Sequence, residues 1–254
     1  MDVKLLVVAA FACSGNKTAP KTAVEDAKAG SAQPVDAMIR IDPSVKGDVQ
    51  IRVEWKDVPV AARASPGRTT CGTARPAAVA PTTTWGVPDV FVAIEVPGSG
   101  SGGAHRIVFG DCLLTPRALT STGTLTIASA TQAPAKLTIQ RAGQLPLGSA
   151  IKEDKARDVY LPIAGHEVEV ALDAGAIYRV AAGDELGWVV ATDHPFIALT
   201  EVTGNIVLRG VPGGTHAITA WLPPRSGQPA RVAKGTVTVN AGALSEVTLD
   251  ITKQ

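Results

Sequence analysis

At 254 residues, the chain is long enough for one large β domain or two small ones, together with a leader and a tether. Hydrophobic residues make up 45% of the sequence, which is enough for a core and excludes wholesale disorder. The formal net charge is +1, from 24 basic and 23 acidic residues, and no basic run with interleaved aromatic residues occurs. We therefore exclude nucleic acid as a partner.

The first residues have the organisation of an export signal. Lys4 supplies a positive charge, and residues 5–12 form an apolar segment that is too short to span a bilayer as a helix. The alanines immediately before Cys13 resemble the bacterial lipobox, so we predict a signal peptide over residues 1–12 and lipidation of Cys13. The alternative is ordinary signal-peptidase cleavage nearby, with Cys13 lost or left as a free thiol. The mass of the mature protein distinguishes the two.

Residues 13–45 show almost no hydrophobic periodicity and are rich in Ala, Lys, Thr, Pro, Asp and Gly, which predicts a flexible tether. Two or three acyl chains on Cys13 would anchor it stably, because each buried CH₂ contributes about 0.8 kcal/mol. Ser14 favours sorting to the outer membrane. We therefore expect an exported envelope lipoprotein, facing the periplasm or the cell surface, that contacts the membrane through its lipid.

Two further cysteines, Cys71 and Cys112, lie in the part of the chain destined for an oxidising compartment. A disulfide between them would close a loop of about 41 residues and stabilise the fold by roughly 4 kcal/mol. The alternative is two buried free thiols. A metal site is not indicated, because His105 is the only histidine in that stretch.

Short segments of alternating polarity, separated by Gly and Pro, run through the rest of the chain. Residues 49–55 and 166–172 alternate most clearly, residues 90–96 are a further strand candidate, and no segment has the 3.6-residue apolar period of a helix. Further strand candidates are residues 105–109, 123–128, 136–140, 177–180 and 187–191, and the most regular series is that of residues 205–208, 216–221, 234–239 and 245–251. This pattern predicts an all-β protein built as β-sandwiches.

The C-terminal segment is similar to the carboxypeptidase regulatory-like domain, a small transthyretin-like β-sandwich. The residues that carry the resemblance are TEVTGNI at 200–206, LRGVPGGTH at 208–216 with a tight turn over 210–215, and AGALSEV at 241–247. Ile206 and His216 stand where the family usually has aromatic residues. The resemblance implies a sandwich segment over residues 199–254 that is itself non-catalytic.

A wider resemblance covers about residues 47–254. It rests on Cys71-Gly72, residues 90–94, Asp111-Cys112 before residues 116–119 and, most specifically, VVATDHPFIALT at 189–200. These pieces resemble bacterial plastocyanin-like proteins of the methylamine-utilisation type. The resemblance implies a cupredoxin-like β-sandwich over residues 46–198, before the regulatory-like segment.

The copper ligands of such relatives are missing. A blue-copper site needs a thiolate, two imidazoles and usually a weak axial Met. The segment 180–187, where relatives carry Cys, His and Met, has none of them, and residues 141–160 contain no histidine. We therefore expect no cofactor. The alternative is a copper-binding or electron-transfer protein with a non-standard ligand set, for which the weak candidates are His166, His194 and His216; we interpret these as structural.

Other catalytic patterns are absent from the sequence. It has no G-x-S-x-G elbow and no H-x-x-E zinc pattern, and the glycine-rich loop at 98–103 lacks a P-loop lysine. The acidic pair Asp184-Glu185 is compatible either with a Ca²⁺ ion or with a solvated turn. We therefore predict a non-enzymatic binding or scaffolding module of the cell envelope, with a protein or a glycan as its partner.

Overall fold

The computed structural model describes residues 45–79, 84–98, 100, 105–151, 154–225 and 227–252, which belong to one compact unit of the chain. The predicted signal peptide, Cys13 and all of the tether except residue 45 lie outside the described residues.

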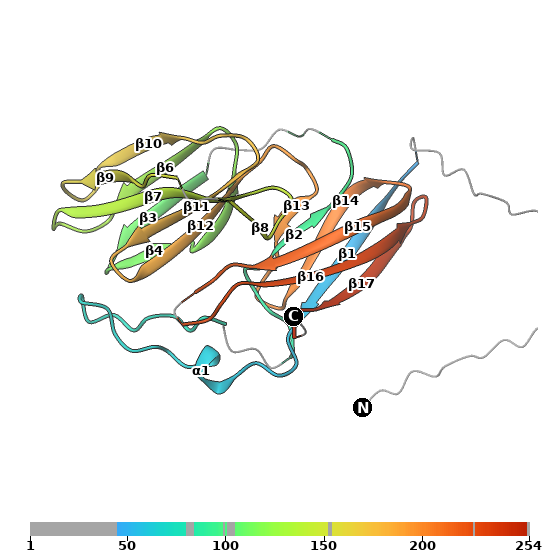
Figure 1. Cartoon of the computed structure of the whole chain (residues 1–254), viewed down its shortest axis with the longest axis horizontal. Coiled ribbons are helices and arrows are strands. Elements are labelled where there is room, and N and C mark those ends of the chain that lie inside the picture. Colours follow the sequence, from blue (N-terminus) through green and yellow to red (C-terminus); the bar gives the residue numbers. More distant parts are fainter. Residues whose placement is uncertain are drawn as a thin grey trace, which may run out of the picture. The chain divides into compact units, whose positions relative to one another are not determined.

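The described chain is almost entirely β, which confirms the all-β prediction (Figure 1). Its only helix in the described residues is α1 (Val60–Arg63). The strands are β1 (Lys46–Glu54), β2 (Phe91–Ile94), β3 (His105–Gly110), β4 (Leu113–Thr115), β5 (Ala118–Ser121), β6 (Thr124–Ser129), β7 (Ala135–Gln144), β8 (Ser149–Ala150), β9 (Arg157–Leu161), β10 (Glu167–Ala171), β11 (Ala176–Ala182), β12 (Glu185–Ala191), β13 (Ile197–Leu199), β14 (Asn205–Pro212), β15 (Gly214–Leu222), β16 (Arg231–Val239) and β17 (Leu244–Asp250).

These strands form four sheets. Sheet I has the order β10-β6-β3-β4, and sheet II has the order β5-β12-β11-β7-β8, with β9 also paired to β7. Sheet III has the order β13-β2-β15-β16, and sheet IV the order β14-β1-β17. Most neighbours are antiparallel, but β1–β17, β3–β6 and β5–β12 pair in parallel.

Three hydrophobic cores separate the four sheets. One core lies between sheets I and II, another between sheets III and IV, and a third, which we call the interface core, between sheets II and III. The two middle sheets are therefore apolar on both faces. On β2, for example, Phe91 and Ala93 pack into the interface core, whereas Val92 and Ile94 pack toward sheet IV. A strand buried on both faces reads as a continuous apolar run.

The sheets do not divide the chain at the predicted boundary between residues 198 and 199. Strand β1 pairs with both β14 and β17, and β2 pairs with β13 and β15, so the N-terminal strands complete the C-terminal sandwich. The other sandwich consists of β3 to β12. Val49, Ile51 and Val53 of β1 are fully buried in the core between sheets III and IV, and this burial explains why the first strand belongs with the last ones.

The turn expected over residues 210–215 is shorter in the structure. Strand β14 continues to Pro212 and β15 starts at Gly214, so only Gly213 lies between them. The glycine of the TEVTGNI segment, Gly204, is required for steric reasons. Gly204 has φ +79°, and a Cβ on it would lie 2.5 Å from the backbone nitrogen of Val87.

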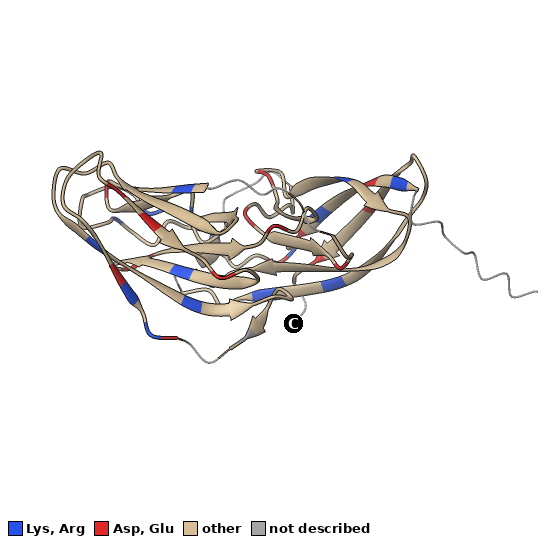
Figure 2. Ribbon diagram, turned by 90° about the horizontal axis from the view of Figure 1, so that it is seen from above, with Lys and Arg blue, Asp and Glu red and all other residues tan. Residues whose placement is uncertain are grey.

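Charges are distributed over the strands and loops of both sandwiches, with both signs interspersed (Figure 2). The ion pairs between exposed side chains, such as Arg106–Glu167 at 2.7 Å, are of the type that contributes little to stability. The charged groups that matter for a site are the buried ones.

Candidate functional site

The segment between β1 and β2, which we name the arm (residues 56–79 and 84–90), contacts both sandwiches (Figure 1). Val79 packs into the core between sheets III and IV. Cys71, in contrast, is bonded to Cys112 in the turn between β3 and β4 of sheet I. The arm therefore reaches from one sandwich to the loop end of the other.

Two arginines hold the backbone of the arm. Arg117, after β4, donates from Nη2 to the carbonyl oxygen of Ala77 at 3.0 Å. Arg225, after β15, donates from Nη1 to the carbonyl oxygen of Ala78 and to the carboxylate of Asp89, each at 3.3 Å. Burial lowers the pKa of Arg225 to about 10, so its guanidinium stays charged at neutral pH. Each sandwich thus contributes one cationic side chain that fixes the arm.

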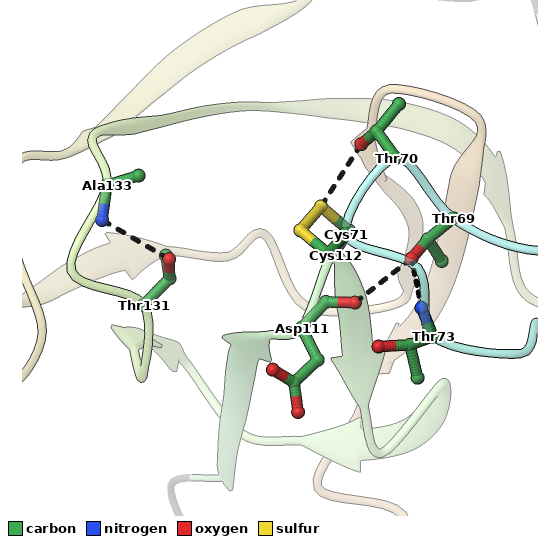
Figure 3. The surroundings of a disulfide bond; sticks show 8 residues. All are labelled: Thr69, Thr70, Cys71, Thr73, Asp111, Cys112, Thr131 and Ala133. Atoms are coloured by element: carbon green, nitrogen blue, oxygen red, sulfur yellow. Dashed lines mark hydrogen bonds between the residues drawn. A yellow bond between two sulfur atoms is a disulfide. The ribbon is translucent and has the colours of Figure 1, made fainter.

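The disulfide expected from the sequence is present in the structure. The Cα atoms of Cys71 and Cys112 are 5.7 Å apart, and the bond joins residues separated by 41 positions. Thr69 donates from Oγ1 to the carbonyl oxygen of Asp111 at 3.3 Å, and Thr70 Oγ1 lies 3.2 Å from the sulfur of Cys112 (Figure 3). Asp111 and Cys112 both have positive φ angles, 53° and 60°, so this turn holds two non-glycine residues in the left-handed region.

A cavity of about 300 Å³, which we name the mouth pocket, opens beside this disulfide. Its walls come from the arm around Cys71, the turn at Cys112, the segment 131–136 and the β11–β12 turn at 182–185. The cavity therefore lies where loops gather at the end of the β3–β12 sandwich, the position at which sandwich proteins commonly carry their binding loops.

Glu185 is the buried charged residue of the mouth pocket. It is the first residue of β12, only 6% exposed, and by strand alternation it points to the same side as Val189, which lies in the core between sheets I and II. No described residue donates a hydrogen bond to its carboxyl group. Burial raises its pKa, against the opposing attraction of Arg117, Arg75 and Arg225. Its carboxyl oxygens are not among the fully buried polar atoms that lack a partner, so they reach the mouth pocket, where solvent or a ligand can contact them.

The neighbouring acidic residue has a different environment. Asp184 lies in the turn before β12 with 79% of its side chain exposed, and it pairs with Nη2 of Arg75 at 3.0 Å. The prediction of a solvated turn is therefore right for Asp184 and wrong for Glu185. The alternative of a cation at this pair is not supported, because three guanidinium groups already act on Glu185.

Two further cavities lie at the interface core. One, of about 340 Å³, contains Trp188 and Trp221, whose ring centroids are 5.5 Å apart in an edge-to-face arrangement. Trp188 donates from Nε1 to the carbonyl oxygen of Pro224 at 2.9 Å. The other, of about 380 Å³, lies beside Leu147 and His194. Because both are lined mainly by apolar side chains that join sheets II and III, we assign them to packing.

His194 already uses both ring nitrogens within the fold. Nε2 donates to the carbonyl oxygen of Val96, and Nδ1 accepts a hydrogen bond from the backbone nitrogen of Phe196 at 3.3 Å. This arrangement fits the neutral tautomer protonated on Nε2. Neither nitrogen remains for a metal, so His194 orients the segment between β12 and β13.

The other candidate ligands are not gathered around His194. His216 lies on β15 and donates from Nε2 to the carbonyl oxygen of Pro212 at 2.8 Å, whereas His166 lies in the loop before β10 of sheet I. The segment 180–187 is the β11–β12 hairpin. Within the part of the chain that the structure describes, no three His, Cys, Asp or Glu side chains converge as metal ligands. The residues present do not fit the copper centre that the resemblance implies.

No family model, curated protein or solved structure matches the chain. Of the described residues, none belongs to a helix with the length and apolar character needed to cross a bilayer. The case for the mouth pocket as a functional site therefore rests on the geometry of its residues.

From the sequence we identified Glu185 as part of an acidic pair but did not predict that its side chain is buried. The signal was available in the period of two along β12, where Glu185 falls in register with the inward-facing Val189 and Ala191. Arg225 had no comparable signal, because it stands in a Pro- and Gly-rich loop and is buried only by the arm and the strands around it.

Proposed function

We propose that the chain is a non-enzymatic lipoprotein of the bacterial envelope that acts as a binding module, with the mouth pocket as its binding site. The lipid anchor at Cys13 and the export signal are proposed from the sequence alone. The sandwich pair is proposed to derive from a cupredoxin-like protein whose copper site is no longer present. The engaged nitrogens of His194 favour this over the copper-binding alternative.

The observation that carries the proposal is the carboxyl group of Glu185. Glu185 lines the mouth pocket, its side chain is almost wholly buried, and it receives no hydrogen bond from a described residue. The mouth pocket instead leaves space for a ligand that supplies the donor, and this is the arrangement of a binding site with few polar groups in an apolar wall.

The arm supports the same proposal. It closes one side of the mouth pocket with Thr69, Thr70 and Cys71, and it is fixed by the disulfide and by the carbonyl contacts of Arg117. A wall held at several points is preorganised, so binding would order few groups. Reduced ordering on binding favours affinity for a small ligand.

A thermal-shift screen of the mature full-length protein tests the proposal. The probes are sugars, amino acids, short peptides, nucleotides and divalent cations at millimolar concentration. A ligand at 100 times its Kd stabilises by about 2.7 kcal/mol, which corresponds to a rise in Tm of about 5–10 °C for a domain of this size. We expect at least one class of probe to raise the Tm of the wild-type protein and to lose this effect in Glu185→Gln. Glu169→Gln, a change at an exposed residue of β10, is the control. The proposal fails if no probe shifts the Tm, or if the shift persists in Glu185→Gln.

A further inference from the structure

The mouth pocket also restricts the chemistry of its ligand, if the proposed function is correct. Glu185 offers acceptor atoms and has no donor among the described residues. A ligand that fills the cavity must therefore present an O–H or N–H group to this carboxyl. This requirement excludes ligands that are purely apolar.

The charges around the mouth pocket cancel one another. Arg75 pairs with Asp184 at 3.0 Å, and Lys136 pairs with Asp158 at 2.9 Å. Deeper in the fold, the buried Arg225 pairs with the partly exposed Asp89 at 3.3 Å, and Arg117 acts electrostatically on Glu185. The charged residues that line the cavity are Arg75 and Lys136, which a cationic ligand would meet, and Asp184 and Glu185, which an anionic ligand would meet. A neutral ligand avoids repulsion by the lining groups of either sign.

The walls of the cavity fit a molecule with a polar edge and apolar faces. Ala133, Pro134 and Ala135 form one apolar side with Phe109, while hydroxyl groups of Thr69, Thr70 and Thr131 lie among the lining side chains. Figure 3 shows the arm threonines beside the disulfide and Thr131 on the neighbouring loop. A pyranose ring has hydroxyl groups at its edge and C–H groups on its faces, and it carries no charge.

We infer that the mouth pocket binds a neutral carbohydrate, with one hydroxyl group donated to Glu185. The hydrogen bond is charge-assisted when Glu185 is ionised, which makes it stronger than a bond between neutral groups. The ligand is either a free sugar or a segment of an envelope glycan, because both present the same hydroxyl groups.

Calorimetric titration of the mature full-length protein tests this inference with three disaccharides of different charge. The probes are N,N′-diacetylchitobiose, which is neutral, chitobiose, which has the same skeleton with two cationic amines, and a uronic acid disaccharide, which is anionic. We expect the neutral probe to bind most tightly. Because Glu185→Gln replaces a charged acceptor with a neutral one of similar shape, it should weaken that binding about five- to tenfold. Glu169→Gln should leave it unchanged.

Co-sedimentation with peptidoglycan sacculi, competed by the neutral disaccharide, identifies a glycan strand as the source of the ligand. Binding of the disaccharide without co-sedimentation identifies a free sugar.

The outcomes separate this inference from the proposed function. Tightest binding of the cationic or the anionic probe would overturn the neutral ligand class and leave the binding module in place. The same conclusion follows if no disaccharide binds but a different solute stabilises the wild-type protein and not Glu185→Gln. Binding of the neutral probe that is unaffected by Glu185→Gln would overturn the mouth pocket as the site. If no disaccharide binds in calorimetry and no probe raises the Tm in the thermal-shift screen, both the carbohydrate ligand and the binding module are contradicted.

Discussion

Replacing both Cys71 and Cys112 with Ala is expected to lower the free energy of unfolding by about 4 kcal/mol, because the disulfide closes a loop of 41 residues. In a domain of this size the Tm should fall by about 8–16 °C. The effect arises mainly in the unfolded state, whose chain entropy the crosslink reduces. It should also loosen the arm locally, since Thr69 and Thr70 hold the same turn through weaker contacts.

Thermal unfolding of the double variant measures this effect, and limited proteolysis followed by mass spectrometry locates it. Cleavage is expected to increase first within the arm, around residues 66–75. Reduction of the wild-type protein should produce the same loss and the same cleavage sites. A Tm within 2 °C of the wild type in both experiments would show that the disulfide does not stabilise the fold.

Trp221→Ala is expected to destabilise the protein by about 3–5 kcal/mol, the range for removal of a large aromatic side chain from a packed core. Trp221 is 5% exposed in the interface core and contacts two other rings. Its ring centroid lies 5.5 Å from that of Phe91 in sheet III and 5.5 Å from that of Trp188 in sheet II. The substitution therefore removes the aromatic contact that joins the two middle sheets.

Denaturant unfolding followed by circular dichroism measures this prediction, with Trp85→Ala as the matched control. Trp85 is 51% exposed, so its replacement should change stability by much less than that of Trp221. Equal effects of the two substitutions would contradict a packed core between sheets II and III. A shift of the midpoint for Trp221→Ala alone would support it.

Alternation of polarity predicted where strands occur but not how they pair. Val49, Ile51 and Val53 mark β1 clearly in the sequence, and the same pattern marks β17 at the other end of the chain. The pairing of these two strands depends on contacts between residues about 200 positions apart, which no local pattern records. For this reason the predicted boundary between residues 198 and 199 does not follow the sheets.

The strands that are buried on both faces were predicted as strands, but their position between two hydrophobic cores was not predicted. Residues 90–96 and 187–191 were identified as strands, and both contribute to the middle sheets II and III. Burial on two faces arises only when two sandwiches share a core. The strands β4, β5, β8, β9 and β13 were missed, four of them because two to four residues give too little alternation to recognise.

The candidate site was predictable only in part. The Cys71–Cys112 pair followed from the number of cysteines and the expected compartment, whereas the mouth pocket beside it depends on the path of the arm. Asp184 and Glu185 are adjacent and chemically alike, yet one is in solvent and the other is buried. Their difference comes from the strand register, which places successive residues on opposite faces.

We propose that the carboxyl group of Glu185 is present for ligand binding and lowers the stability of the folded protein. Its pKa in the folded state lies above the ordinary value of 4.5, so the folded protein disfavours the ionised form. Wild-type stability should therefore decrease as the pH rises from that value through the raised folded pKa, and a glutamine at this position should escape the loss. Burial raises the pKa of Glu185 by more than Arg117, Arg75 and Arg225 together lower it, and this difference sets the direction of the expected change in stability.

The most direct test is the Tm of Glu185→Gln and of the wild-type protein at pH 4 and at pH 8, without ligand. We expect the variant to be more stable than the wild type at pH 8 and the difference to shrink toward pH 4, where the carboxyl is largely protonated in both states. A variant less stable than the wild type at pH 8, with the two converging at pH 4, would contradict the account. Glu185 would then be a structural partner of Arg117, and the mouth pocket would lose its principal binding group.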